Sequence, residues 1–350
     1  MLKSRRLLIC LLIVAMMFGT LSIFAAAQDK PVIGVSVPVL ANPFWQRYVG
    51  FVKVVADQLG VEVKIVDCQN SEGQQVLDIE NLLASGVDGL IVTPQTAQVG
   101  PTIIARAEAN GVPIAITDRW PGIDPREYPW AGFVGFIGPD DEDAGYNIAK
   151  TLIVELGMKN IAAINGVHGA SVAEGRYAGL DKALKEFPDV NLVDVQWIGE
   201  NIDQGMQVME NYLSAYPDKV EGIWCYNDAL AVGAVKALMN AGNDKIKVVG
   251  MDLNPDAVEL IKVGDYYASF GGHWLQGGFG LIMLYDYLEG YPPEPEYRVA
   301  RLKLMKVAES DVDAFMDQFV DNPPSIDATK ISKAKNPQAS GKYFFEISLK

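Results

Sequence analysis

Residues 32–59 read VIGVSVPVLANPFWQRYVGFVKVVADQL, in which a short apolar run, a turn and an amphipathic stretch follow one another. The run at 32–37 is rich in Val and Ile, which favours a strand buried on both faces. Asn42 is a good helix N-cap, and Pro43 suits the first turn of a helix. The apolar stripe of that helix consists of Phe44, Tyr48, Val52, Val55 and Leu59. The stretch therefore predicts a strand followed by a helix, the repeating unit of a parallel α/β sheet.

The same alternation continues along the chain. Including the first, strands are expected at 32–37, 61–66, 89–93, 113–117, 133–137, 160–164, 192–196, 222–226, 247–251 and 266–270. Helices are expected at 43–59, 74–84, 97–109, 142–156, 171–185, 204–215, 229–241, 255–263 and 275–288. These strands are too many for one open sheet in 350 residues, so we expect an α/β protein with two doubly wound parallel-sheet lobes. One more strand is expected at 301–307, with irregular structure wrapping one lobe beyond Pro323.

The first 27 residues have the pattern of an export signal. Three cations among the first six residues precede an apolar run at 7–24, and Ala25-Ala26-Ala27 supplies small residues before Gln28. We expect a signal peptide cleaved near Ala27 and a soluble periplasmic protein. The alternative is an uncleaved membrane anchor, because the apolar run is long enough to span a bilayer.

Composition excludes several classes of function. The chain has 29 basic and 44 acidic residues, a formal charge of -15, and no basic block that could neutralise nucleic-acid phosphates. Three cysteines and two histidines are too few for a Cys/His zinc cluster, so no metal site is expected. The chain has neither a G-x-S-x-G elbow nor a nucleotide-binding glycine loop, so neither enzymatic activity nor a cofactor is expected. Cys68 and Cys225 are expected to be buried free thiols.

Polar and aromatic residues gather just after several predicted strands. They are Asn42 with Phe44 and Trp45, Asp118 with Arg119, Asn227 with Asp228, and Asp252. Ligands of open α/β sheets bind at the carboxyl ends of strands. Carboxylates, amides and a guanidinium can pair the hydroxyls of a polyol while aromatic rings cover its C–H faces. Two alternatives stay open, since Asn and Asp also cap helices and Asp118 with Arg119 could form an internal ion pair.

Four motifs carry a resemblance to a known family. They are Val-Leu-Ala-Asn42-Pro43-Phe44-Trp45, Gly-Val-Pro-Ile-Ala-Ile-Thr-Asp118-Arg119, Trp-Cys-Tyr-Asn227-Asp228-Ala-Leu-Ala-Val-Gly and Val-Val-Gly-Met-Asp252. Over about residues 31–310 the chain resembles the ribose- and galactose-type periplasmic sugar-binding proteins of ABC transporters, whose fold is the type I periplasmic binding protein fold. LacI-type repressors share this core but carry an N-terminal helix-turn-helix, where this chain has the predicted signal peptide.

The resemblance implies two similar lobes joined by a three-stranded hinge that closes on a sugar. One lobe is expected to comprise 28–135 and 273–298, the other 136–272 and 299–322, with an irregular tail at 323–350. The implied ligand is a neutral monosaccharide or polyol, and the implied partner is an ABC permease in the inner membrane. We expect a monomer. The alternative is a signalling receptor that presents a sugar-like or autoinducer ligand to a chemoreceptor or sensor kinase.

The resemblance also assigns roles to residues. Asn42 is expected to bond hydroxyls, Phe44 and Trp45 to stack on the sugar ring, Asp118 and Arg119 to hold one sugar edge, and Asn227 and Asp252 the other. The second-lobe half departs from the family pattern. Glu174 stands where the family often has a sugar-contacting arginine, and Glu200 with Asn201 stands where an aromatic is expected. His273 is an equal candidate for ligand contact and for hydrogen bonding at the hinge. These departures argue against plain ribose.

Overall fold

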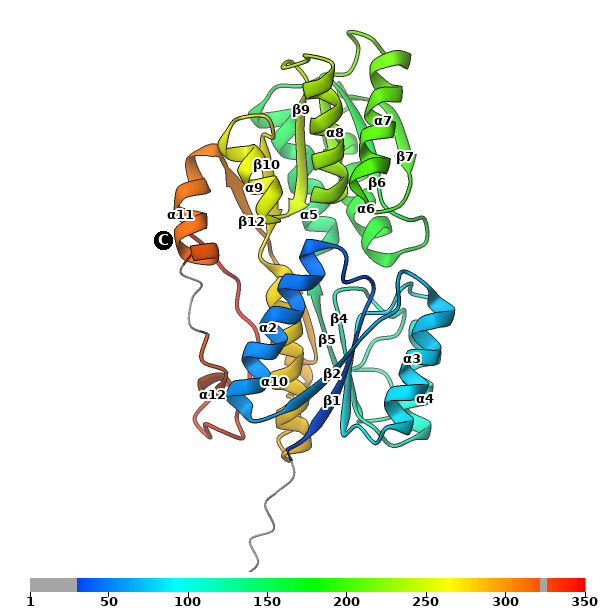
Figure 1. Cartoon of the computed structure of the whole chain (residues 1–350), viewed down its shortest axis with the longest axis vertical. Helices are drawn as coiled ribbons and strands as arrows, with labels where there is room; N and C mark the ends of the chain where they lie inside the picture. Colours follow the sequence, from blue (N-terminus) through cyan, green and yellow to red (C-terminus); the bar gives the residue numbers. More distant parts are fainter. Residues whose placement is uncertain (1–29, 322–325, 350) are drawn as a thin grey trace, which may run out of the picture. The chain divides into compact units, whose positions relative to one another are not determined.

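The computed structural model describes residues 30–321 and 326–349. From Val32 onward the chain forms one compact unit (Figure 1). The predicted signal peptide and Cys10 lie outside the described residues. Among the residues described, no helix has the length and apolar character needed to cross a membrane.

The first sheet has six strands in the order β11-β5-β4-β3-β1-β2. They are β1 (Val32–Val37), β2 (Glu62–Asp67), β3 (Gly89–Val92), β4 (Ile114–Thr117), β5 (Phe133–Pro139) and β11 (Val299–Leu302). All of its strand pairs are parallel. Helices α2 (Pro43–Leu59) and α10 (Gln276–Leu288) pack together on one face, and α3 (Glu72–Ala84) and α4 (Gly100–Ala109) lie on the other (Figure 1). This sheet and its helices form the first lobe.

The second sheet repeats this arrangement in the order β12-β10-β9-β8-β6-β7. Its strands are β6 (Asn160–Asn165), β7 (Asn191–Trp197), β8 (Gly222–Cys225), β9 (Lys247–Asp252), β10 (Ala268–Gly271) and β12 (Met305–Ala308). Its helices are α5 (Asp141–Lys150), α6 (Ser171–Glu186), α7 (Ile202–Ala215), α8 (Asp228–Asn240) and α9 (Pro255–Lys262). Only β12 runs antiparallel to its neighbour. The predicted α/β fold with two doubly wound lobes is confirmed.

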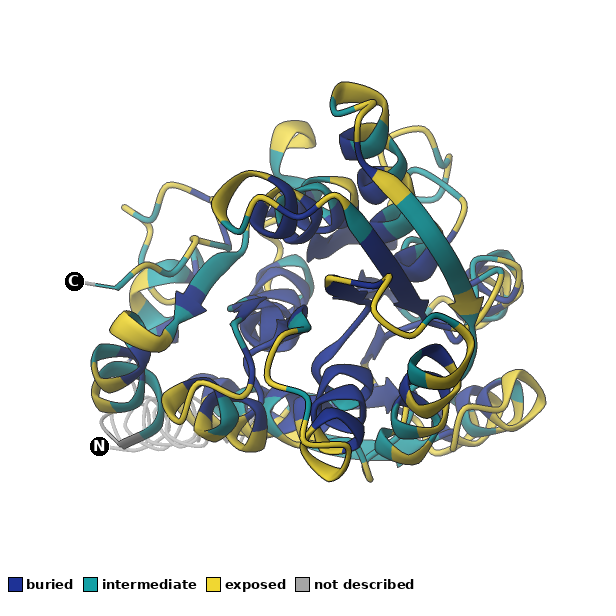
Figure 2. Ribbon diagram, turned by 90° about the horizontal axis from the view of Figure 1, so that it is seen from above, coloured by how far each residue is buried: buried dark blue, intermediate teal, exposed yellow. Residues whose placement is uncertain are grey.

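The inner strands of each sheet are buried because helices cover both faces, as the dark blue arrows in Figure 2 show. The edge strands β2 and β7 are partly exposed along their length. The expected strands up to 266–270 all occur, with ends that shift by at most two residues. Cys68 and Cys225 are buried free thiols, as predicted. The expected single strand at 301–307 is wrong, because β11 joins the first sheet and β12 the second. The residue pattern at 299–308 does not show that two strands are present, because each strand has only four residues and neither carries a mark of its sheet.

The chain passes between the two sheets three times. These connections join β5 to α5, β10 to α10, and β11 to β12. The first and third lie later than expected, because residues 136–139 and 299–302 pair with each other inside the first sheet. The middle connection contains Gly272, whose φ of 115° is poorly tolerated by other residues. These three connections are the candidate hinge.

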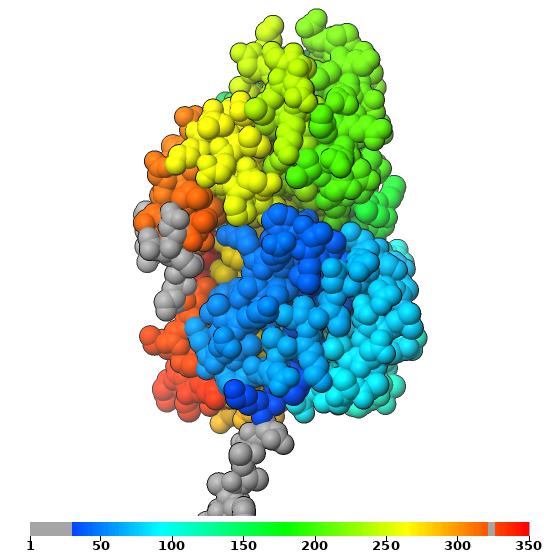
Figure 3. All heavy atoms as spheres, in the orientation of Figure 1, coloured from blue at the N-terminus to red at the C-terminus, as the bar shows by residue number. Residues whose placement is uncertain are grey.

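The segment 326–349 begins beside α2 of the first lobe (Figure 3), and its end lies at the connection between β11 and β12, where Glu346 accepts the Lys303 backbone N–H at 3.3 Å. Gln58 of α2 bonds the backbone of Ile326 and Ala328, and Asp286 of α10 accepts the Lys333 backbone N–H at 2.6 Å. Tyr343 is fully buried. The expected irregular structure is interrupted by one short helix, α12 (Ala328–Ile331), and the rest of the segment has no helix or strand among the residues described.

Candidate ligand site

A small cavity lies where strand ends of both sheets meet. It has a volume of about 20 Å³, room for about one water molecule. Its lining residues come from both lobes and are Asn42, Phe44, Trp45, Asp118, Arg119, Arg176, Glu200, Tyr226, Asn227, Asp252 and His273. Of the nine predicted site residues, all but Glu174 are among them.

The start of α2 forms the apolar wall of the cavity. Phe44 and Trp45 are 4% and 3% exposed, and their rings meet edge to face with centroids 5.0 Å apart. The Phe44 ring also lies 4.5 Å from the His273 ring. Asn42 caps the helix, because its Oδ1 accepts the Phe44 backbone N–H at 2.9 Å. Its Nδ2 has no partner among the described residues, so Asn42 can cap the helix and still donate into the cavity.

Asp118 and Arg119 enter the cavity directly after β4. Gln276 Nε2 donates to Asp118 Oδ1 at 2.6 Å, and Arg119 Nη1 donates to the Gln95 carbonyl at 2.7 Å. Arg119 Nε lies 3.9 Å from Asp118 Oδ2. Burial raises the pKa of Asp118, although the charges of Arg119 and Arg176 lower it. Asp118 and Arg119 therefore form an internal ion pair and also line the cavity.

Asn227 and Asp252 approach from the second lobe. Asn227 Oδ1 caps α8 by accepting the Leu230 backbone N–H at 3.0 Å. Asp252 Oδ1 lies 3.6 Å from His273 Nε2. Burial and the charge of Asp228 raise the pKa of Asp252 well above its usual value, although Arg176 lowers it. Burial, with the charges of Arg176 and Arg47, lowers the pKa of His273 well below its usual value, so the imidazole is neutral at pH 7.

Two contacts join the lobes beside the cavity. Arg119 Nη2 of the first lobe donates to both carboxylate oxygens of Glu200 at 3.3 Å. Arg47 Nη1 of α2 donates to the Leu253 carbonyl of the second lobe at 2.6 Å. The Arg47 guanidinium also lies 3.6 Å from the centre of the Trp274 ring, which packs rather than lines the cavity. Charged groups of one lobe thus contact the other lobe at the site itself.

Comparison with known proteins agrees with this architecture. The family model described as a periplasmic binding protein domain matches residues 33–292, well over half of the 350-residue chain. The chain belongs to the periplasmic binding protein family.

Relatives of this periplasmic binding protein cover most of its length. The ribose import binding protein of Bacillus subtilis is 33% identical over 66% of this chain and 72% of its own. The xylitol-binding protein of Mycolicibacterium smegmatis is 28% identical over 70% of this chain and 68% of its own. An ABC transporter periplasmic solute-binding protein from Actinobacillus succinogenes with bound D-allose is 27% identical, with a TM-score of 0.73 over 81% of this chain and 99% of its own. These relatives are binding proteins rather than enzymes.

Three cavity residues of this periplasmic binding protein were not predicted as ligand contacts. Arg176 Nε donates to Asp141 at 3.0 Å, its Nη1 donates to the Tyr226 carbonyl at 2.9 Å, and its guanidinium lies 4.4 Å from the Tyr226 ring centre. Tyr226 OH donates to Glu200 Oε1 at 3.1 Å. Little in the sequence indicated these contacts. Arg176 occupies a position that usually has a structural role in the family, and Glu200 stands where the family pattern has an aromatic residue. Tyr226 precedes Asn227 directly, which was the only cue to its position.

Glu174 does not line the cavity. Its side chain is 45% exposed and lies 2.8 Å from Nδ1 of the exposed His168. Glu174 Oε1 also accepts the Gly169 backbone N–H at 3.0 Å. The carboxylate therefore holds the turn before α6 and points away from the second-lobe wall, which Arg176 supplies instead.

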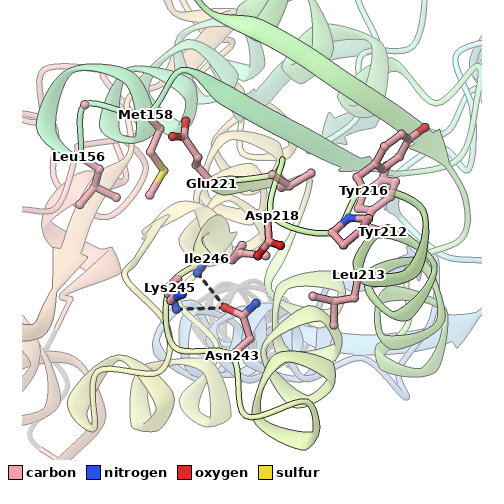
Figure 4. A pocket seen from close by; sticks show the side chains of 13 residues that line it. Leu156, Met158, Tyr212, Leu213, Tyr216, Asp218, Glu221, Asn243, Lys245 and Ile246 are labelled. Atoms are coloured by element: carbon pink, nitrogen blue, oxygen red, sulfur yellow. Dashed lines mark hydrogen bonds between the residues drawn. The ribbon is translucent and has the colours of Figure 1, made fainter.

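A larger pocket lies away from this cavity, and its polar side chains bond to nearby loops. It has a volume of about 440 Å³ and lies at the opposite edge of the second sheet, among the loops before β6, β8 and β9 (Figure 4). Its Asn243 Oδ1 accepts the backbone N–H groups of Lys245 and Ile246. Glu221 likewise accepts the backbone N–H groups of Lys159 and Asn160. These polar side chains satisfy loop backbone rather than converge on a ligand.

Proposed function

We propose that this chain is an exported solute-binding protein of an ABC transporter, which captures a neutral monosaccharide or polyol between its lobes and delivers it to a membrane permease. One observation carries the proposal above the others. Seven residues selected for polyol chemistry, from strand ends of two separate sheets, line one cavity together with His273. Helix capping alone explains Asn42 and Asn227 but gives no reason for this convergence.

The charges at the cavity support a neutral ligand. Two guanidinium groups, Arg119 and Arg176, face three carboxyl groups, Asp118, Glu200 and Asp252. The raised pKa of Asp252 favours its protonated form, and His273 is neutral. The site therefore has no surplus charge for an ion. Carboxylates and guanidinium groups bond hydroxyls strongly, with about 1.5 to 3 kcal/mol for each hydrogen bond to a charged group.

The comparisons support polyhydroxylated ligands. The named ligands of the relatives are ribose, xylitol and allose, all neutral polyols of five or six carbons. None of the three is assigned to this chain. The edge-to-face aromatic pair Phe44 and Trp45 suits the C–H face of such a ring.

The ligand test is direct. The purified protein is denatured, the released small molecules are identified by mass spectrometry, and their binding is measured by calorimetry on refolded protein. A neutral sugar or polyol that binds with a stoichiometry of about one is the expected result. A cationic amine or a peptide as the bound molecule would overturn the ligand class.

A second experiment tests the transport role. Ligand-loaded protein is used to capture membrane proteins from the source organism, and the captured partner is identified. A permease subunit is expected. A chemoreceptor or sensor kinase as the specific partner would instead establish the signalling alternative.

A further inference from the structure

Glu200 lies in the loop between β7 and α7 and reaches across to the first lobe. Its side chain is 9% exposed, and that of Arg119 is 2% exposed. Both carboxylate oxygens lie 3.3 Å from Arg119 Nη2. Tyr226 OH donates to Oε1 at 3.1 Å and so holds the carboxylate in this position. Glu200 is thus a fixed, nearly buried anion at the ligand cavity.

Glu200 is the nearest carboxylate to the guanidinium of Arg119. The other nearby carboxylate, Asp118, approaches Nε only to 3.9 Å, and Nη1 is taken by the neutral carbonyl of Gln95. Arg119 Nε has no hydrogen-bond partner among the described residues. Burial lowers the pKa of Arg119, but Glu200, Tyr226 and Asp118 together raise it above its usual value. The protein therefore already supplies partners for both Nη groups of Arg119, an anion at Nη2 and a carbonyl at Nη1, so a ligand anion at this guanidinium would lie next to Glu200.

We propose that Glu200 is a specificity-determining residue that excludes acidic sugars, such as uronates and aldonates, from this site. The inference rests on the proposed function, since it defines which polyols the cleft accepts. A ligand carboxylate brought to Arg119 meets the carboxylate of Glu200 in a poorly solvated cavity, where like charges repel strongly. A hydroxyl at the same place donates to Glu200 and accepts from Arg119. Discrimination thus arises from a repulsive element as well as from attractive contacts.

Matched ligand pairs test the proposal. D-galactose with D-galacturonate, D-xylose with D-xylonate, and D-ribose with D-ribonate serve as probes, because each pair compares a neutral sugar with its acid. Binding is measured by calorimetry for the parent, Glu200→Gln and Glu200→Asp. The control is Glu174→Gln, which removes a carboxylate from the same lobe outside the cavity. Thermal unfolding checks that each variant is folded.

The expected result is a change in the ratio of the two affinities. The parent binds the neutral member of a pair more tightly than the acid by about tenfold or more. Glu200→Gln keeps the shape, replaces one acceptor oxygen with an amide donor and removes the charge. We expect it to shift that ratio toward the acid by about tenfold or more. Glu200→Asp and Glu174→Gln keep the preference of the parent.

Two outcomes would overturn the inference and leave the proposed function intact. One is a parent that binds an acid as tightly as its neutral partner, a measurement that needs no variant. The other is a folded Glu200→Gln protein with an unchanged ratio. If the parent binds no member of any pair and its co-purifying molecule is not a polyol, the proposed function fails and the inference fails with it.

Discussion

Asp118 and Asp252 end strands in different sheets and share an unusual backbone conformation. Their φ angles are 63° and 129°, and Leu253 follows at 58°. Non-glycine residues in this region are strained by about 1 to 3 kcal/mol each. The strain turns each carboxylate out of the strand and into the cavity, where both side chains are nearly buried. Backbone conformation, as well as residue type, therefore marks these two positions as functional candidates.

We expect Asp118→Asn and Asp252→Asn each to weaken binding of the co-purifying ligand by about tenfold to a hundredfold. Asn keeps the shape but replaces one carboxyl oxygen with an amide NH2 group, which halves the acceptor capacity at both positions and removes the negative charge of Asp118. A loss of about 1.4 kcal/mol corresponds to a factor of ten in affinity. Calorimetry measures the effect, and Asp256→Asn on the exposed start of α9 is the control. Unchanged affinity in both cleft variants would remove these residues from the site.

His273 gives a pH-dependent prediction. Unfolded His273 binds a proton below about pH 6.5, whereas the buried imidazole does not. Stability is therefore lost as the pH falls below about 6.5, at up to about 1.4 kcal/mol per pH unit. Urea unfolding between pH 5 and pH 7 should show a smaller loss in His273→Gln than in the parent. His168→Gln, at a side chain that is 74% exposed, is the matched control. An equal pH dependence in parent and His273→Gln would refute the prediction.

At the scale of elements, close helix packing positions the second-lobe wall. Helices α5 and α6 cross where Gly145 faces the backbone of Arg176. The same contact brings Asp141, at the start of α5, to the Arg176 guanidinium at 3.0 Å. The position of Arg176 in the cavity therefore depends on two small residues at the crossing, Gly145 and Gly179, rather than on α6 alone.

Gly145→Ala should destabilise the protein by about 1 to 3 kcal/mol or more and weaken ligand binding. A Cβ at this position would lie 1.9 Å from the Arg176 carbonyl oxygen, so the helices must separate. Denaturant unfolding and calorimetry measure the two effects. Gly73→Ala in α3 is the control, because its nearest neighbour is 4.0 Å away. If Gly145→Ala unfolds like the control variant, the helix crossing does not constrain the site.

At the scale of the whole molecule, the same topology produces both the candidate site and the candidate hinge. Residues that follow strands of both sheets line the cavity, and within the described strands the chain crosses between the sheets at three connections, near Pro139, Gly272 and Leu302. The cavity of about 20 Å³ is far too small for a monosaccharide. We therefore infer that ligand entry needs the lobes to part at these connections and then close again.

Small-angle scattering should detect this motion. Ligand-stripped protein is expected to have a larger radius of gyration than protein saturated with its co-purifying ligand. A bound ligand can contact residues of both lobes only in the closed form, so it stabilises that form. Adding a sugar that does not bind is the control. A radius of gyration that stays constant at saturating ligand would contradict hinge closure.

Export makes a separate prediction at this scale. The order of positive, apolar and small residues in 1–27 predicts that the mature protein begins near Gln28. Intact mass of the protein from the soluble exported fraction measures this. A membrane-retained species that keeps residues 3–24 would show that the segment is an anchor.

The sequence alone determined the strands, the helices and most of the first-lobe site. Val32–Val37 and Pro43–Leu59 follow from apolar periodicity and capping, which are local properties. Position at the carboxyl end of a strand predicted four cavity residues, Asn42, Asp118, Asn227 and Asp252. Parallel topology brings such strand ends to one edge of the sheet. Both β11 and β12 are extended segments, and a local pattern predicts an extended segment without saying which sheet it joins. The sequence therefore did not show that these two strands join different sheets.

Only the tertiary structure decided which side chains complete the second-lobe wall. Glu174 and Arg176 lie two residues apart on α6, yet one faces solvent and the other the cavity, since the helix crossing with α5 sets which face is buried. Glu200 reaches Arg119 across 81 residues of chain. Such contacts between lobes leave no periodic trace in the sequence, because they arise from the packing of whole elements rather than from the conformation of neighbouring residues.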